Sequence, residues 1–375
     1  MIEAVAEAYR VGFGNVTAAF PASRRADEIV AGCRRAVADL VGGVPDGVVL
    51  GPNMTSLTYR FAQALAKTWR EGDEIVLSRL DHDANVRPWA QAAAGAGAVV
   101  KWAEFNPVTA QLPADQYGEL VGERTRLVAV TAASNVLGTR PDVAAIAARA
   151  HQAGALVYVD GVHATPHGPT DVAALGADFY ATSAYKWSGP HIGAVIAAPE
   201  LLETLHPDKL APSPDTVPLR FETGTSPFAD LAGVTAAVDH LAALDPAAAA
   251  TQGTGDDSRR ARLLASMASA EAHELELFAA LRDGLEKLPG VTLYGRPERQ
   301  TATVFFNVAG FPPRAVAEHL AERRINVWSG HNYAWEATAV LGIRDSGGAV
   351  RAGLVHYNDR SDVDRLLEAV AELTG

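Results

Sequence analysis

The chain alternates short apolar runs with stretches of helical periodicity from about residue 47 onward. Short apolar runs bounded by turn residues are typical of buried strands, and apolar residues three and four positions apart are typical of helices that cover a sheet. The alternation therefore predicts an α/β fold with a mostly parallel sheet and helices on both faces. The expected strands are Gly47–Leu50, Glu74–Ser78, Ala98–Trp102, Leu127–Ala132, Ala155–Asp160, Ala177–Thr182 and Ile192–Ala197, and the expected helices include Ser56–Arg70, Asn85–Ala94 and Val143–Ala153.

A different pattern follows residue 258 and predicts a smaller α+β unit. It comprises a long helix ending near Pro289, strands at Val291–Tyr294, Thr303–Val308, Ile325–Trp328 and Val350–Val355, a helix at Arg314–Arg323 and a last helix after the cap Ser361. We expect a large domain at 15–245 and a small domain built from 1–14 and 259–375. The Ala- and Gly-rich residues 246–258 are expected to form a linker or mobile loop. With 375 residues, 48% of them hydrophobic, the chain is long enough for two cores.

The amino-acid composition argues against some classes of binding partner. The 44 acidic and 32 basic residues give a net charge of −12, which opposes binding to nucleic acid and to anionic membrane surfaces. A single cysteine, Cys33, excludes an intramolecular disulfide and a cysteine-based metal cage, as expected for a cytoplasmic protein. The opening residues do not resemble a signal peptide, and no apolar run is long enough to span a membrane.

Lys186 is the first candidate for chemistry. Only five of the 32 basic residues are lysines, and Lys186 follows an expected strand between Tyr185 and Trp187. A lysine held away from water has a lowered pKa and attacks carbonyl carbons. An ordinary loop lysine is the alternative interpretation of this segment.

Asp160 is the second candidate, because it ends an expected buried strand. A buried carboxylate is costly unless it meets a cation, and a protonated ring nitrogen of a cofactor would be one. A helix cap or a loop salt bridge is the alternative.

Two other kinds of site are alternatives to these candidates. Asp160, His163 and His167 lie close together in the sequence, and His163-x-x-x-His167 imitates the spacing of zinc ligands, but Pro166 argues against a helix between them. Asp81-His82-Asp83 is a second acidic-histidine cluster, which is more typical of a capped turn, and we expect no metal. Ser183-x-x-Lys186 imitates a serine hydrolase motif, whose S-D-N and K-T-G partners are missing from the sequence.

Taken together, these segments resemble the class V aminotransferase family from about residue 45 to the C-terminus. The likeness is greatest to the branch that contains cysteine desulfurases, selenocysteine lyases and isopenicillin N epimerase. The segments that match the family are, in order, Gly-Asp-Glu-Ile at 72–75, Asp81–Trp89, Ser134–Thr139, Asp160–His163, Ser183–Lys186 and Phe221–Thr225. The resemblance implies fold type I, the cofactor pyridoxal 5'-phosphate and a homodimer.

The resemblance also implies roles for individual residues. Lys186 would form the Schiff base with the cofactor and move the proton at the substrate's α-carbon. Asp160 would pair with the pyridinium nitrogen, and His82 would stack on the ring. Asn135 would bind the cofactor's phenolic oxygen and lie near the substrate, with His163 standing where the family usually has glutamine.

The resemblance also implies which residues bind the cofactor phosphate and the substrate carboxylate. The cofactor phosphate would lie on the turn before a helix, where free amides suit an anion. Tyr185 stands where desulfurases have a phosphate-binding histidine. The residues implied for the phosphate are Asn53, Met54, Thr55, Ser183, Tyr185 and, from the partner subunit, Thr225; Arg351 would bind the substrate α-carboxylate.

Two departures from the family bear on the activity. Desulfurases carry a nucleophilic cysteine in a loop reading Gly-His-His-Cys, where this chain reads Gly330-His331-Asn332-Tyr333. Cys33 falls in an expected helix and is interpreted as a small buried hydrophobe. The family also begins with a Gly- and Ala-rich segment that lines the pocket, so we expect either a missing segment or a pocket open on one side.

The sequence thus predicts a pyridoxal-phosphate enzyme that acts on a small amino acid. The leading hypothesis is a lyase that cleaves C–S or C–Se bonds without a persulfide cysteine. An aminotransferase or epimerase comes second, and a binding or regulatory protein that keeps the fold comes third. Joint retention of Lys186, Asp160, His82 and Arg351 argues against the third, because the fold alone needs none of them.

Overall fold

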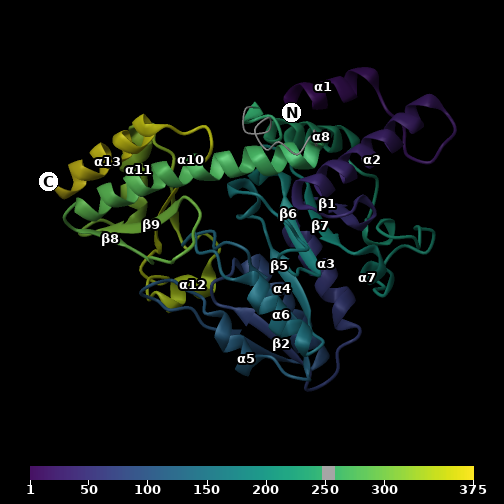
Figure 1. Ribbon diagram of the computed structural model, residues 1–375, viewed down its shortest axis with the longest axis horizontal. Helices are drawn as coiled ribbons and strands as arrows, with labels where there is room; N and C mark the ends of the chain where they lie inside the picture. Colours follow the sequence, from purple (N-terminus) through teal and green to yellow (C-terminus); the bar gives the residue numbers. More distant parts are fainter. Residues whose placement is uncertain (247–257) are drawn as a thin grey trace.

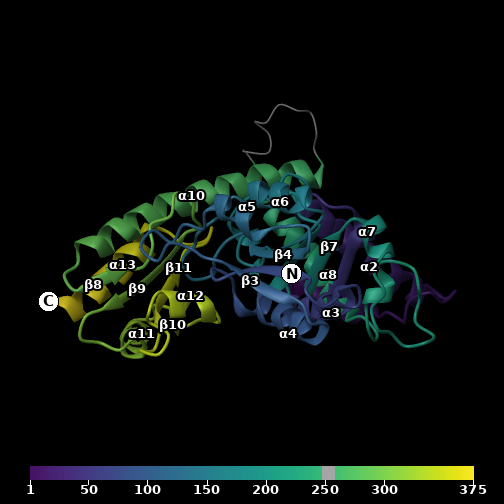
Figure 2. The same cartoon turned by 90° about the horizontal axis from the view of Figure 1, so that it is seen from below.

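The computed structural model describes residues 1–246 and 258–375. Two units lie next to each other, each with its own sheet, and the long helix α10 (Arg259–Lys287) runs along both of them (Figures 1 and 2). Of the expected linker at 246–258, the residues 247–257 lie outside the described part of the chain.

The larger unit contains a seven-stranded sheet in the order β1-β7-β6-β5-β4-β2-β3. Only β7 runs against its neighbours in this sheet, so the expected mostly parallel sheet is confirmed. The strands are β1 (Val48–Gly51), β2 (Glu74–Ser78), β3 (Val99–Ala103), β4 (Thr125–Thr131), β5 (Leu156–Asp160), β6 (Phe179–Ser183) and β7 (Gly193–Ala197).

Helices cover both faces of this sheet because successive strand residues point to opposite sides. In β4, Leu127 and Ala129 pack with α3 and α4, whereas Val128 and Val130 pack with α2, α6 and α8. The helices are α2 (Pro21–Val41), α3 (Met54–Ala66), α4 (Arg87–Ala96), α6 (Val143–Gln152) and α8 (Phe228–Leu241), with short helices α5 (Tyr117–Leu120) and α7 (Pro199–Glu203).

The smaller unit is a four-stranded antiparallel sheet in the order β10-β11-β9-β8. Its own apolar core lies between the sheet and the helices α10, α11 and α13. The elements are β8 (Val291–Leu293), β9 (Thr303–Val308), α11 (Pro313–Glu322), β10 (Trp328–Gly330), α12 (Trp335–Val340), β11 (Ala349–Gly353) and α13 (Arg360–Thr374).

Several expected element ends are shifted, and the capping residues explain two of the shifts. Helix α3 begins before Ser56, because the side chain of Asn53 accepts the Ser56 amide and caps the helix. Helix α13 begins before Ser361, because Asp359 and Asp362 form a capping box. The strand expected at Ile325–Trp328 is instead β10, displaced toward the loop that follows it.

The N-terminal helix α1 (Ile2–Val11) belongs to the larger unit. It packs on α8, which packs on α2, at the end of the molecule away from the four-stranded sheet (Figure 1). The expectation that placed 1–14 in the small domain is therefore wrong. In residues 1–246 and 258–375, no helix combines the length and apolar character needed to cross a membrane.

Candidate active site

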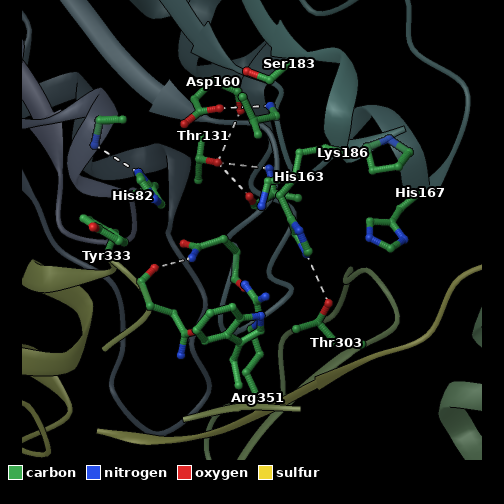
Figure 3. A pocket seen from close by; sticks show the side chains of 18 of the residues that line it. His82, Thr131, Asp160, His163, His167, Ser183, Lys186, Thr303, Tyr333 and Arg351 are labelled. Carbon is green, nitrogen blue, oxygen red and sulfur yellow. Dashed lines mark hydrogen bonds between the residues drawn. The ribbon is translucent and has the colours of Figure 1, made fainter. Parts of the chain in front are cut away.

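A cavity of about 670 Å³ opens where the parallel strands end and the smaller sheet begins. Thr131, Asp160 and Ser183 end β4, β5 and β6, and all three line it (Figure 3). Parallel sheets place ligands at this edge. Ten of the expected site residues line the cavity, namely Met54, Thr55, His82, Asn135, Asp160, His163, Ser183, Tyr185, Lys186 and Arg351; Asn53 and Thr225 do not.

Lys186 ends the short 3-10 helix η5 (Ala184–Lys186) that follows β6. In the described part of the chain its Nζ has no hydrogen-bond or ion-pair partner, and it lies 6.0 Å from the centre of the Tyr185 ring. Burial and the charge of Arg351 lower the pKa of Lys186, against the opposing effect of Asp160. A partly desolvated, unpaired amine of this kind can become a neutral nucleophile.

Asp160 is 4% exposed, and its Oδ1 accepts the amide N–H of Val162 at 2.9 Å. Burial raises its pKa to about 6, although the Val162 hydrogen bond and the charge of Lys186 act in the opposite direction. Among the described residues, no cation forms a salt bridge with this carboxylate. A cationic ring nitrogen placed beside it would supply the missing charge.

His82 precedes the 3-10 helix η2 (Asp83–Asn85), and its Nδ1 accepts the Ala84 amide at 3.0 Å. This bond holds one edge of the ring, and the side chain lines the cavity (Figure 3). Burial, with a smaller effect of Lys186, lowers the pKa of His82 to about 4, so the ring is neutral. The Tyr333 ring stacks on His82 with centroids 5.5 Å apart and an interplanar angle of 23°.

The turn before α3 contacts the end of β6 and the start of β7. The Ser183 hydroxyl accepts the Met54 amide at 3.0 Å. A side chain at Gly193 would lie 2.2 Å from the carbonyl carbon of Asn53, so only glycine permits this approach. The turn thus presents the start of a 13-residue helix to the cavity, as an anion would require.

Asn135 and Arg351 lie together on the side of the cavity formed by β11. The Arg351 guanidinium donates to the Asn135 carbonyl at 3.1 Å, and burial lowers its pKa. The Asn135 side-chain amide donates to the Asn332 carbonyl at 2.8 Å. Its Oδ1 is buried without a partner in the described residues. A partly buried guanidinium with no carboxylate partner in the same residues suits an anionic group of a ligand.

His163 lies between the cavity and the smaller sheet. Its Nε2 is 3.1 Å from the Thr303 hydroxyl and 3.2 Å from the Thr301 hydroxyl. Burial lowers its pKa well below the usual value, and the neighbouring cations add to this effect. His167, weighed above as a metal ligand, lines the same wall, with ring centroids 4.8 Å apart. Within the described ranges, no three acidic, histidine or cysteine side chains are placed to hold a metal ion.

Of three further residues considered in the sequence analysis, only Tyr185 lines the cavity. Tyr185 lines the cavity, and its ring stacks on His191 with centroids 4.2 Å apart. Thr225 is exposed beside Phe228 and lines a separate hollow with Tyr9, so within one chain it lies away from Lys186. Cys33 is fully buried in α2, where burial raises its pKa to about 12.

The residues of the cavity fit pyridoxal phosphate. Three groups that line the cavity lack a salt-bridge or hydrogen-bond partner among the described residues. They are the carboxylate of Asp160, which forms no salt bridge, and the side-chain amide oxygen of Asn135 and the amine of Lys186, which have no partner of either kind. The helix start beside Gly193 adds a place for the phosphate. Asp160 would face the ring nitrogen, Lys186 the aldehyde and His82 the ring.

Fold and cavity together have the organisation of a fold type I enzyme. The chain belongs to the class V aminotransferase family: the family described as "Aminotransferase class-V" matches residues 1–266 and 259–366. Members of this family depend on pyridoxal phosphate.

Individual relatives agree with this assignment. An uncharacterized protein of Mycobacterium tuberculosis is 40% identical over 370 residues, covering 98% of this chain and 90% of the relative. A probable cysteine desulfurase of Pseudomonas putida is 33% identical over 347 residues, covering 86% and 77%. The crystal structure of the cysteine desulfurase CsdA of Escherichia coli superposes with a TM-score of 0.84 at 30% identity, covering 99% and 90%.

Some residues of the cavity, and one residue beside it, were not expected from the sequence. Thr303 and Trp328 come from β9 and β10, and Thr131 ends β4. Glu274 in α10 contacts His167, although 107 positions separate them. Threonines in strands and a glutamate in a long helix are ordinary at the level of sequence, so no signal could have identified them.

Proposed function

We propose that this protein is a pyridoxal-phosphate enzyme that eliminates a sulfur or selenium group from the β-carbon of a small amino acid. The observation that carries the proposal is the joint position of Lys186, Asp160 and Arg351 around one cavity. When bound, the cofactor would act as the electron sink for the bond electrons released at the α-carbon.

Each residue has a defined task in this proposal. Arg351 binds the substrate α-carboxylate through its guanidinium and so fixes the orientation of the α-carbon. Lys186, with its lowered pKa, removes the α-proton through Nζ. Asp160 keeps its negative charge beside the cationic ring nitrogen and stabilises that charge. His82 covers the ring face and excludes water.

A persulfide mechanism is not part of the proposal, because no thiol is placed to receive sulfur. Cys33, the single cysteine, is buried in α2 and does not line the cavity. A thiol with a pKa near 12 is almost entirely protonated at neutral pH and is a poor nucleophile. The loop carries Tyr333 at the position where desulfurases place their cysteine.

Product analysis tests the proposed reaction. Purified protein supplied with pyridoxal phosphate is given cysteine, S-methylcysteine, selenocysteine and alanine in separate reactions. Pyruvate released together with sulfide, methanethiol or selenide supports the lyase. Alanine released from cysteine would show desulfuration instead, and a keto acid formed with the amine form of the cofactor would show transamination. Either of these results would refute the lyase.

A further inference from the structure

A buried histidine–glutamate pair lies at the wall of the cavity. His167 in the 3-10 helix η4 (Thr165–His167) and Glu274 in α10 are joined through Nδ1 and Oε2 at 2.6 Å. Glu274 is 1% exposed, and its Oε1 has no hydrogen-bond partner among the described residues. A buried carboxylate with an unsatisfied oxygen destabilises the fold, and apolar residues of similar size would fill this space more favourably.

The pair is linked to the cavity through a second imidazole. The ring of His163 lies against that of His167, with centroids 4.8 Å apart, and both residues line the cavity. On the other side of His167, Glu274 belongs to α10, which packs against η4. Two imidazoles and a carboxylate therefore follow one another from the cavity to α10.

His163 is suited to pass a proton in either direction. Its lowered pKa keeps it neutral, and a neutral imidazole accepts a proton on one nitrogen while it donates from the other. Nε2 contacts the hydroxyls of Thr301 and Thr303, and Nδ1 has no partner in the described part of the chain. A small rotation of either ring, or one bridging water molecule, would join His163 to His167.

We propose that His167 and Glu274 supply the proton that His163 delivers to the leaving group of the substrate. This inference rests on the proposed function and adds the source of a proton that the reaction requires. His163 is the residue that touches the substrate. His167 and Glu274 act through it and are positioning residues.

The proton balance of elimination explains the need for this supply. A substrate R–S–CH₂–CH(NH₃⁺)–COO⁻ and one water give R–SH, pyruvate and NH₄⁺. The α-proton goes to Lys186, which later returns it to the β-carbon as the methyl proton of pyruvate. The C–S bond breaks with both electrons on sulfur, and that sulfur takes a proton from His163, which receives one from His167 in the same step. Glu274 stabilises the positive charge on His167 before the transfer. Water then replaces the nitrogen at the α-carbon: one of its protons leaves with ammonium, and the other restores His167.

The other charged groups around the rings of His163 and His167 do not supply the proton for the leaving group. Arg140 donates to the His167 carbonyl and pairs with Glu271 at 3.1 Å. The charged or titratable neighbours of His163 and His167 are Lys186, Arg351, Arg140, Glu271, Glu274 and His356. Of these, Lys186 is committed to the α-proton, and the arginines do not deprotonate.

The leaving group provides the test. S-Methylcysteine releases a thiolate that needs a proton, whereas β-chloroalanine releases chloride, which needs none. We expect Glu274→Gln to lower kcat for S-methylcysteine about 10- to 100-fold with little change in KM, and to leave kcat for β-chloroalanine unchanged. The ratio of the two rates in one preparation is independent of how much protein has folded. His167→Asn should show the same ratio.

Glu276→Gln is the matched control, because Glu276 is exposed on the same helix. An independent readout uses cofactor-free protein: the His167 Nδ1 proton should give a downfield NMR signal that Glu274→Gln abolishes. If Glu274→Gln slows both substrates equally, or neither, the proton supply is refuted while the proposed function stands. If the unsubstituted enzyme converts neither substrate, the proposed function itself has failed.

Discussion

Asp160 ends β5, Lys186 follows the neighbouring parallel strand β6, and both line one cavity. The charge of Lys186 lowers the pKa of Asp160, and the charge of Asp160 raises the pKa of Lys186. For both groups burial acts more strongly than this attraction. The cavity therefore holds an amine that gives up its proton readily and a carboxyl group that keeps its proton to higher pH than usual. Both pKa shifts result from the burial of these two side chains at the carboxyl edge of the parallel sheet.

The first prediction concerns the stability of the cofactor-free protein. The pKa of Asp160 is about 6 in the folded chain and about 3.8 as a reference value. Because the folded pKa is the higher one, the contribution of Asp160 to stability is complete below about pH 4 and is lost as the pH rises through about 6. The shift corresponds to on the order of 3 kcal/mol. We therefore expect Asp160→Asn to gain stability relative to the unsubstituted protein between pH 4 and 7.

Urea unfolding of the two proteins at each pH measures this difference. Comparing the pair removes the contribution of His82, which titrates in both proteins. The charge of Asp160 helps to raise the pKa of Asp81, so its removal also lowers that pKa and adds to the difference in the same direction. Asp46→Asn, at an exposed position, is the control and should show a difference that does not depend on pH. A pH-independent difference for Asp160→Asn would contradict the account of this carboxylate.

The second prediction concerns Cys33. Because its thiol is buried in α2 away from the cavity, Cys33→Ala should keep the rate of turnover on cysteine-like substrates. The free energy of unfolding should fall by about 1 kcal/mol through the loss of one buried group. Cys33→Ser should cost more, since it buries a hydroxyl among apolar neighbours. Loss of turnover in a stable Cys33→Ala protein, or a persulfide on Cys33 during turnover, would show that the thiol takes part.

The third prediction concerns recognition of the substrate. Arg351→Gln removes the guanidinium proposed to bind the α-carboxylate, and we expect KM for the amino acid to rise about 100-fold, equivalent to nearly 3 kcal/mol. Steady-state kinetics give the value. Arg360→Gln, on the exposed side of α13, should leave KM unchanged. An unchanged KM in Arg351→Gln would place the carboxylate elsewhere.

The fourth prediction concerns the proposed homodimer, in which Thr225 would complete the phosphate site of the partner subunit. Lys186→Ala and Thr225→Ala proteins are mixed and allowed to exchange subunits. If Thr225 acts across the interface, each mixed dimer contains one site with both residues intact, and full cofactor affinity returns in half of the remaining lysine sites. No recovery on mixing, or sedimentation as an active monomer, would exclude this role.

The sequence predicts the larger sheet and most of the site because both depend on local signals. Apolar strands such as β5, which ends in Asp160, and β6 can be recognised without tertiary information, and Lys186 follows β6. The positions that were missed depend on packing between distant segments. Glu274 reaches His167 only because α10 packs against η4, and Thr303 reaches His163 only because β9 lies beside the turn that follows β5.

The position of α1 was predicted wrongly for a similar reason. Its sequence shows an amphipathic helix, but the sequence does not show which surface its apolar side covers. The structure places that side on α8. The shifted start of α13 has a local cause, since Asp359 satisfies more free amides than Ser361 could at that end.

The central claim is that Lys186 holds pyridoxal phosphate, and one measurement tests it most directly. The protein is saturated with the cofactor, reduced with borohydride, digested and analysed by peptide mass spectrometry. We expect a single reduced cofactor adduct on Lys186, and none in the Lys186→Ala protein treated in the same way. An adduct confined to Lys67, Lys101, Lys209 or Lys287, or no adduct at saturating cofactor, would contradict the account.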